Sequence, residues 1–172
     1  NLQRWQARCD ALSLVNRPHI KTHKLAGLAR IQLDLGAKGI TVQKLGEAEV
    51  MADAGITDML LTFNVVGEGK LRRLSALARR TGIAVVADNK AVVEGLGHAG
   101  RTAGRAVDVL VECDTGAGRN GVQTPQDATD LASLIDRTDG LSYGGLMTYP
   151  KNGTRTRSDD FFAEAVRLTA AH

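Results

Sequence analysis

Short, almost wholly apolar runs alternate with longer amphipathic segments along this chain, and that alternation limits its possible folds more than any other feature. Residues 83–87 (IAVVA) and 107–111 (VDVLV) are typical of the apolar runs. Runs of this kind predict strands that are buried on both faces of a parallel sheet. Strands separated by helices at this spacing predict βαβ units, and therefore an α/β fold.

The pattern predicts six strands and six helices in alternation. The strands are expected at residues 18–22, 39–43, 59–63, 84–87, 107–112 and 141–149. The helices are expected near residues 25–35, 44–54, 67–81, 90–103, 125–137 and 159–171. Gly36 and Gly55 are predicted C-terminal stops of two helices, and Thr124-Pro125 predicts the N-cap and first residue of another.

The polar residues at the predicted strand ends bear on the choice between two architectures. Eight strand–helix units would close a barrel of the triosephosphate isomerase type, which typically needs about 250 residues. An open doubly wound sheet is the alternative, and periodicity alone does not choose between them. Nearly every strand ends in a polar residue, namely Lys21, Gln43, Asn64, Asp88, Asp114 and Tyr149. A barrel mouth shows such a pattern, whereas an open sheet concentrates its site at one switch point.

Lys21 lies in the first predicted strand between two histidines of the same parity. Because side chains alternate across a strand, His19, Lys21 and His23 would share one face, which points inward in a barrel. A lone ammonium there is costly unless it is paired or neutral, and a lysine that forms an imine with an aldehyde avoids the cost. Lys24, of opposite parity, is the rival amine, and a solvated lysine at the rim is the other possibility.

A glycine-rich loop follows the strand predicted at residues 107–112. Gly116, Gly118 and Gly121 satisfy G-x-G-x-x-G, so a dinucleotide site is a competing interpretation. Against it, the next helix is expected to begin only at Pro125, and Arg119 is bulky where a pyrophosphate needs close backbone approach. The alternatives are a surface turn, or a loop that directs the rigid donors of Arg119 toward an oxygen or ring nitrogen of an aromatic cofactor.

Composition excludes several classes of function. Charged residues make up 24% of the chain and aromatic residues 3%, with a formal net charge of +3. Because no long basic run or interleaved aromatic residues occur, we expect no nucleic-acid partner. No apolar stretch approaches the roughly 18 residues of a membrane span. Cys9 and Cys113 match no metal or redox spacing, and free cysteines without a signal peptide predict a reducing, cytoplasmic setting.

Four sequence runs together carry a family resemblance. They are RPHIKTHK at residues 17–24, GITVQKLGEAE at 39–49, ECDTGAGRNG at 112–121 and GLMTY at 145–149. With them the chain resembles the D-threonine aldolase family and its relatives, eukaryotic-type D-serine dehydratase and the 3-hydroxyaspartate enzymes. The resemblance implies a (β/α)8 barrel of the alanine racemase N-terminal type, belonging to the fold type III pyridoxal-phosphate enzymes. It also implies two further strands and a C-terminal β domain, so we expect residues 1–172 to form one incomplete barrel domain.

The resemblance also implies roles for individual residues. Lys21 corresponds to the lysine that carries pyridoxal 5′-phosphate as a Schiff base, Arg119 to an arginine that contacts the cofactor ring, and Tyr149 to a tyrosine beside the cofactor. The further pocket candidates, by strand parity and position, are His19, His23, Thr41, Gln43 and Asn64. A divalent metal (Mn or Mg) is implied for full-length relatives, with no ligand in this chain. The histidine that follows the tyrosine in the aldolases is absent from residues 150–154, which leaves the base for proton abstraction without a candidate.

The activity that the resemblance implies is the retro-aldol cleavage of β-hydroxy-D-amino acids, with D-threonine giving glycine and acetaldehyde. A dehydratase acting on D-serine or 3-hydroxy-D-aspartate is the alternative, because the same cofactor supports both reactions. A pyridoxal-phosphate-binding protein without catalysis is a further alternative. In each enzyme case the partner is a small-molecule substrate, and the family implies a homodimer at full length.

Overall fold

The computed structural model describes residues 1–169 and contains a single parallel sheet with helices between its strands. In chain order the elements are α1 (Leu2–Ala11), the 3₁₀ turn η1 (Ile20–Thr22), α2 (Ala26–Asp34), β1 (Ile40–Val42), α3 (Leu45–Asp53), β2 (Asp58–Leu61), α4 (Glu68–Ala78), β3 (Gly82–Ala87), α5 (Lys90–Ala103), β4 (Val107–Cys113), α6 (Pro125–Arg137), β5 (Leu141–Thr148) and α7 (Arg155–Thr169).

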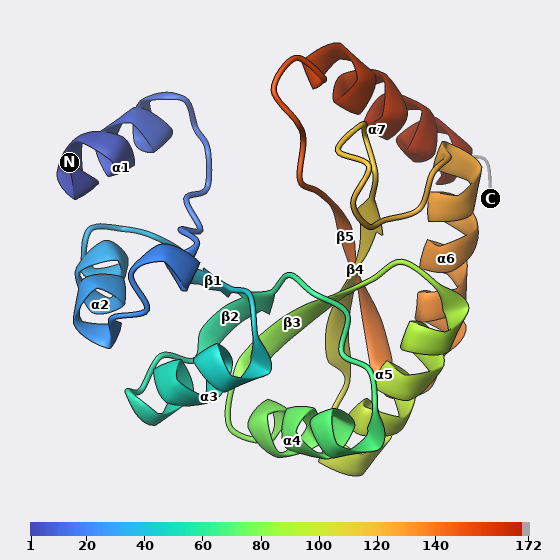
Figure 1. Cartoon of the computed structure of the whole chain (residues 1–172), viewed down its shortest axis with the longest axis horizontal. Helices are drawn as coiled ribbons and strands as arrows, with labels where there is room; N and C mark the ends of the chain where they lie inside the picture. The colour runs from blue at the N-terminus through green and yellow to red at the C-terminus, as the bar shows by residue number, and fades with distance from the viewer. Residues whose placement is uncertain (170–172) are drawn as a thin grey trace.

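The strands are arranged in the order β1-β2-β3-β4-β5, each paired in parallel with the next along the chain. A register shift between Val109 and Leu110 marks a bulge in the pairing of β4 with β5. Helices α3 to α7 follow one another in an arc on one side of the strands (Figure 1). The predicted α/β fold, an incomplete barrel, is confirmed.

Alternate residues of each strand face the helices and form the core. Along β4, Val107, Val109 and Val111 are almost completely buried and belong to the same apolar cluster as Leu96 of α5 and Ile135 of α6. The residues between them must face the opposite side of the sheet, because side chains alternate. That opposite face, which a closed barrel would enclose, carries the candidate site.

The predicted helix ends are confirmed where a local signal marks them. Gly36 and Gly55 follow α2 and α3 with φ of 115° and 83°, a left-handed conformation that glycine adopts without strain. Thr124 accepts the N–H of Asp127 at 3.1 Å, and Pro125 is the first residue of α6. The helix α6 therefore begins at the position that the Thr124-Pro125 pair predicted.

The strand predicted at residues 18–22 is wrong. Only His19 forms a bridge, parallel to Thr41, and the chain then turns into η1. The His19 Nδ1 atom accepts the backbone N–H of Lys21 at 3.3 Å, and the carbonyl of Ile20 accepts the N–H of Lys24 at 2.8 Å. These local bonds satisfy groups that a strand would have paired with its neighbour.

The last helix begins earlier than expected. It was predicted at residues 159–171 but starts at Arg155, and residues 170 and 171 lie outside the described residues. Ser158, in its first turn, donates to the hydroxyl of buried Thr115 at 2.7 Å and thereby fixes the helix to the loop after β4. Within residues 1–169, no helix has both the length and the apolarity to cross a membrane.

Candidate active site

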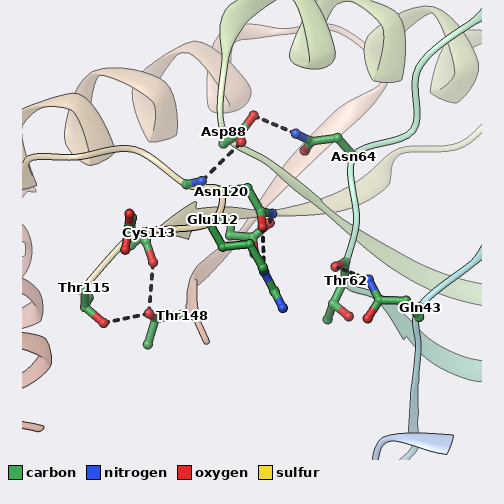
Figure 2. Close-up of polar contacts among 12 residues, drawn as sticks. Gln43, Thr62, Asn64, Asp88, Glu112, Cys113, Thr115, Asn120 and Thr148 are labelled. Atoms are coloured by element: carbon green, nitrogen blue, oxygen red, sulfur yellow. Dashed lines mark hydrogen bonds and ion pairs between the residues drawn. The ribbon is translucent and has the colours of Figure 1, made fainter. Parts of the chain in front are cut away.

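Polar side chains gather at the carboxyl ends of the parallel strands. Figure 2 shows members of this group, including Gln43, Thr62, Asn64, Asp88 and Glu112. They come from successive strands or the residues just after them. Because the carboxyl ends of parallel strands meet at one edge, side chains far apart in sequence become neighbours there.

A pocket of about 310 Å³ opens among these strand ends. It is lined by His19, Lys21, Thr41, Gln43, Leu60, Thr62, Arg119, Met147, Thr148 and Tyr149. The structure thus brings together six of the eight predicted site residues, from η1, β1, the loop after β4 and the end of β5 or the residues next to them. The other two, His23 and Asn64, are not among the residues that line the pocket.

Lys21 reaches the pocket from the 3₁₀ turn, with its side chain half-buried. Its Nζ lies 5.3 Å from the centre of the Tyr149 ring. Among residues 1–169, no carboxylate or other acceptor forms an ion pair or hydrogen bond with this amine, which lies instead over the face of the Tyr149 ring. An amine without a partner, facing a pocket, is open to react with an incoming carbonyl.

His19 and Gln43 form a fixed pair beside the lysine. Because His19 Nδ1 accepts the Lys21 N–H, the ring proton belongs on Nε2, which lies 3.4 Å from Gln43 Oε1. Burial and the nearby Lys21 ammonium lower the pKa of His19, so the ring is neutral at pH 7. Gln43 Nε2 in turn donates to the Thr62 carbonyl at 3.4 Å. These bonds fix the orientation of both side chains.

Arg119 also contacts the Tyr149 ring: its guanidinium carbon is 4.4 Å from the ring centre, so two cations share one aromatic ring. Its Nε donates to Asn120 Oδ1 at 2.8 Å, and its Nη2 lies 3.7 Å from Glu112 Oε1. The remaining donors of the guanidinium stay available to a ligand in the pocket.

The loop that carries Arg119 is shaped by Asp114. The Asp114 carboxylate accepts the N–H groups of Gly116 at 2.9 Å and Gly118 at 3.1 Å. These backbone donors hold the pKa of Asp114 below its ordinary value. Asp114 was predicted to be the polar group of its strand end, but it serves the loop and does not line the pocket.

Lowering the pH below about 4 is expected to remove the stability that Asp114 contributes. Its folded-state pKa is depressed, so the contribution is present above the unfolded pKa and is lost as the pH falls through the folded value. The difference in unfolding free energy between the wild type and Asp114→Asn should therefore be smaller at pH 3 than at pH 7. Urea titrations at the two pH values measure it, and an unchanged difference would contradict this role.

His23 and Lys24 point to other partners. His23 Nδ1 accepts the N–H of Leu25 at 3.1 Å, and Lys24 Nζ forms an ion pair with Glu47 Oε1 at 3.0 Å. The parity argument that grouped His23 with His19 and Lys21 is wrong, because alternation does not hold in a 3₁₀ turn. The choice of Lys21 over Lys24 as the amine in the pocket agrees with the structure.

Sequence reasoning missed two polar residues of the site. Glu112 is a buried carboxylate within β4, and Asn120 follows Arg119 in the glycine loop. The signal for Glu112 was present, because a charge near the end of an otherwise apolar strand is costly unless it has a partner. Asn64, a predicted candidate, donates to Asp88 Oδ1 at 2.7 Å and does not line the pocket of Lys21.

Comparison with known proteins identifies the family. Residues 1–171 match the family described as alanine racemase, N-terminal domain. The chain belongs to the alanine racemase N-terminal domain family. The start of α6 at Pro125, beyond the third glycine, differs from the dinucleotide fingerprint, in which the helix opens within the glycine motif.

Two named proteins are similar to this chain over most of its length. The chain is 38% identical over 170 residues to D-threonine aldolase of Arthrobacter sp., which covers 99% of this chain and 45% of that protein. It is 36% identical over 152 residues to D-threo-3-hydroxyaspartate dehydratase of Delftia sp. (strain HT23), covering 87% of this chain and 40% of that protein.

One solved structure superposes closely on this chain. The crystal structure of D-threonine aldolase from Filomicrobium marinum matches with a TM-score of 0.95 at 34% identity, covering 99% of this chain and 49% of that one. The chain therefore spans somewhat less than half the length of these relatives. Within residues 1–169, no group of three or more His, Cys, Asp or Glu side chains is arranged to hold a metal ion.

Cys113, which ends β4 beside the site, is expected to resist alkylation in the folded chain. Burial, and secondarily the neighbouring Glu112 carboxylate, raise the pKa of its thiol to about 12, and the thiolate is the reactive form. Iodoacetamide at pH 8 should leave the Cys113 peptide unmodified until urea is added. Modification of that peptide in the folded chain would contradict the burial.

Proposed function

We propose that this chain supplies the cofactor-binding part of a pyridoxal-phosphate-dependent lyase that cleaves β-hydroxy-D-amino acids, D-threonine giving glycine and acetaldehyde. The observation that carries the proposal is the unpaired Lys21 amine, which shares one pocket with Arg119 and Tyr149. The 38% identity to a D-threonine aldolase supports the reaction class.

The residues present fit this cofactor. The Lys21 amine would hold its aldehyde carbon covalently, the Tyr149 ring offers an aromatic wall, and Arg119 has free donors for an acceptor atom of the ring. When bound, pyridoxal phosphate acts as an electron sink for the α-carbon of the substrate, which carries the substrate's own amine.

Arg119 and Gln43 present polar groups of fixed character to a ligand in the pocket. Arginine stays protonated at every working pH, so the cofactor atom that it contacts must act as an acceptor. Gln43, fixed between His19 and the Thr62 carbonyl, forms a polar wall on the side of β1. These side chains would orient the cofactor and its substrate.

A second candidate function is dehydration of a β-hydroxy-D-amino acid. The 36% identity to D-threo-3-hydroxyaspartate dehydratase favours it, since that relative also covers most of the chain. Both reactions use the same lysine and cofactor, and they differ in which bond of the substrate breaks.

Product analysis separates the two candidates. Full-length protein that contains residues 1–172 is incubated with pyridoxal phosphate and Mn²⁺ and offered D-threonine, L-threonine or D-serine. Acetaldehyde and glycine from D-threonine alone support the aldolase. Pyruvate and ammonia from D-serine, without acetaldehyde from D-threonine, would replace it with the dehydratase. Covalent cofactor binding without turnover of any of these substrates would contradict both and favour a non-catalytic binding protein.

A further inference from the structure

A buried carboxylate lies behind the pocket without lining it. Glu112, in β4, is 1% exposed and faces the same side of the sheet as Leu110, toward the interior of the incomplete barrel. Burial raises the pKa of this carboxyl group. A charge in such a position costs free energy unless hydrogen bonds or an opposite charge compensate it, so its partners indicate its purpose.

The partners of Glu112 are two consecutive residues of the glycine loop. Its Oε2 accepts from Asn120 Nδ2 at 2.5 Å, and its Oε1 lies 3.7 Å from Arg119 Nη2. Asn120 also accepts from Arg119 Nε at 2.8 Å. Three side chains therefore form a closed triangle in which the Asn120 amide connects the carboxylate to the guanidinium.

This triangle restricts an otherwise mobile side chain. Arg119 is 40% exposed and sits on a loop in which Gly116 and Gly118 have positive φ. An exposed arginine loses much rotamer freedom when it binds a ligand. The hydrogen bond to Asn120 and the ion pair with Glu112 both involve the Nε–Nη2 edge of the guanidinium, and together they restrict its plane over the Tyr149 ring before any ligand arrives.

We propose that Glu112 is a positioning residue that, together with Asn120, holds the Arg119 guanidinium in the orientation that contacts the cofactor. The proposal rests on the proposed function, because it assumes that the ligand of Arg119 is pyridoxal phosphate in the pocket of Lys21. Glu112 itself touches no ligand, since it is buried and does not line that pocket. Its effect on cofactor binding must therefore pass through Arg119.

A double-mutant cycle tests this route. Cofactor affinity is measured by absorbance titration with pyridoxal phosphate in the full chain, for the wild type, Glu112→Gln, Arg119→Ala and the double variant. Glu112→Gln should weaken cofactor binding about tenfold, because the NH₂ group of the new side chain is a donor and would face the N–H donors of Asn120 or Arg119. Arg119→Ala should weaken it by roughly 100-fold. Adding Glu112→Gln to Arg119→Ala should change the affinity less than about twofold, because the residue through which Glu112 acts is already gone.

The control variants separate positioning from general loss of structure. Glu49→Gln removes the carboxylate of another arginine pair, with Arg73 on the helix side, and should leave cofactor affinity unchanged. Asn120→Ala removes the bridge but keeps Glu112, and it reports on the same route if Glu112→Gln does not fold. It should weaken binding only while Arg119 is present.

Three outcomes would overturn the proposal. Equal loss of affinity from Glu112→Gln in both Arg119 backgrounds would show that the carboxylate stabilises the fold and does not position the arginine. Unchanged affinity in both folded Glu112→Gln and Asn120→Ala would show no role. Absence of any borohydride-reducible adduct in the wild type would refute the proposed function as well, whereas a normal adduct with additive effects would refute the positioning role alone.

Discussion

Replacing Lys21 with alanine is expected to abolish covalent cofactor binding and to lower kcat/KM for D-threonine by on the order of 10⁴-fold or more. The reason is that Lys21 is the amine that faces the pocket beside Tyr149, with no acceptor of its own within residues 1–169. Lys21→Arg should be nearly as inactive. It keeps the positive charge near the ring but has no amine that can form an imine. Steady-state assays of acetaldehyde release measure both variants.

Lys24→Ala is the matched control for these variants. Lys24 lies three residues further along the same run, but its amine is paired with Glu47 outside the pocket of Lys21. Its loss should cost about 1 kcal/mol of stability, because the Lys24 side chain is 55% exposed although that of Glu47 is only 9% exposed. It should change kcat/KM less than about threefold. An active Lys21→Ala chain, or an inactive but folded Lys24→Ala chain, would reverse the assignment.

Replacing Gly121 with alanine is expected to destabilise the glycine loop by about 3 kcal/mol or more and to weaken cofactor binding with it. Gly121 has a φ of 118°, and a Cβ there would lie 2.5 Å from the backbone nitrogen of Asp114 and 2.6 Å from the carbonyl carbon of Cys113. These two atoms belong to the peptide bond between Cys113 and Asp114, and rigid backbone leaves the methyl group no space, so the loop that carries Arg119 must move. Urea unfolding and a pyridoxal-phosphate titration report the two effects.

Gly118 provides the comparison within the same loop. It also has a positive φ, of 64°, but a Cβ there would meet nothing within 4 Å. Gly118→Ala should therefore cost only the left-handed backbone penalty, about 1 kcal/mol, and leave cofactor affinity nearly unchanged. Equal destabilisation by the two substitutions would mean that backbone conformation, and not close approach to β4, explains the need for glycine at Gly121.

Most of the fold could be predicted from the sequence, because its strands are buried and their composition is therefore locally apolar. Strands buried against helices produce apolar runs, and β1 to β5 all lie within a few residues of their predicted positions. The segment around Lys21 was mispredicted because a side chain decides its conformation. The bond from the Lys21 N–H to His19 Nδ1 turns the chain into a 3₁₀ helix, and no periodicity reports such a bond.

The candidate site was predictable in part, because polar residues follow the predicted strands. Strand-end positions correctly brought Gln43 and Tyr149 to the pocket, and the glycine loop brought Arg119 there. Lys21 lines the pocket, but it does so from a 3₁₀ turn and not from a strand. The strand-parity argument for its position was therefore wrong. Glu112 was overlooked although it is the last residue of the predicted strand, because Asp114, two residues later, was assigned as the polar residue of that strand end. Only the three-dimensional contacts show that Asp114 bonds to its own loop.

The central claim is that Lys21 holds pyridoxal phosphate, and one labelling experiment tests it directly. The folded chain is incubated with pyridoxal phosphate, reduced with borohydride and digested, and the modified peptide is located by mass spectrometry. The claim predicts a single stable adduct on Lys21, in the peptide that contains His19 and Ile20. An adduct on Lys24, or none on a chain shown to be folded by circular dichroism, would contradict it.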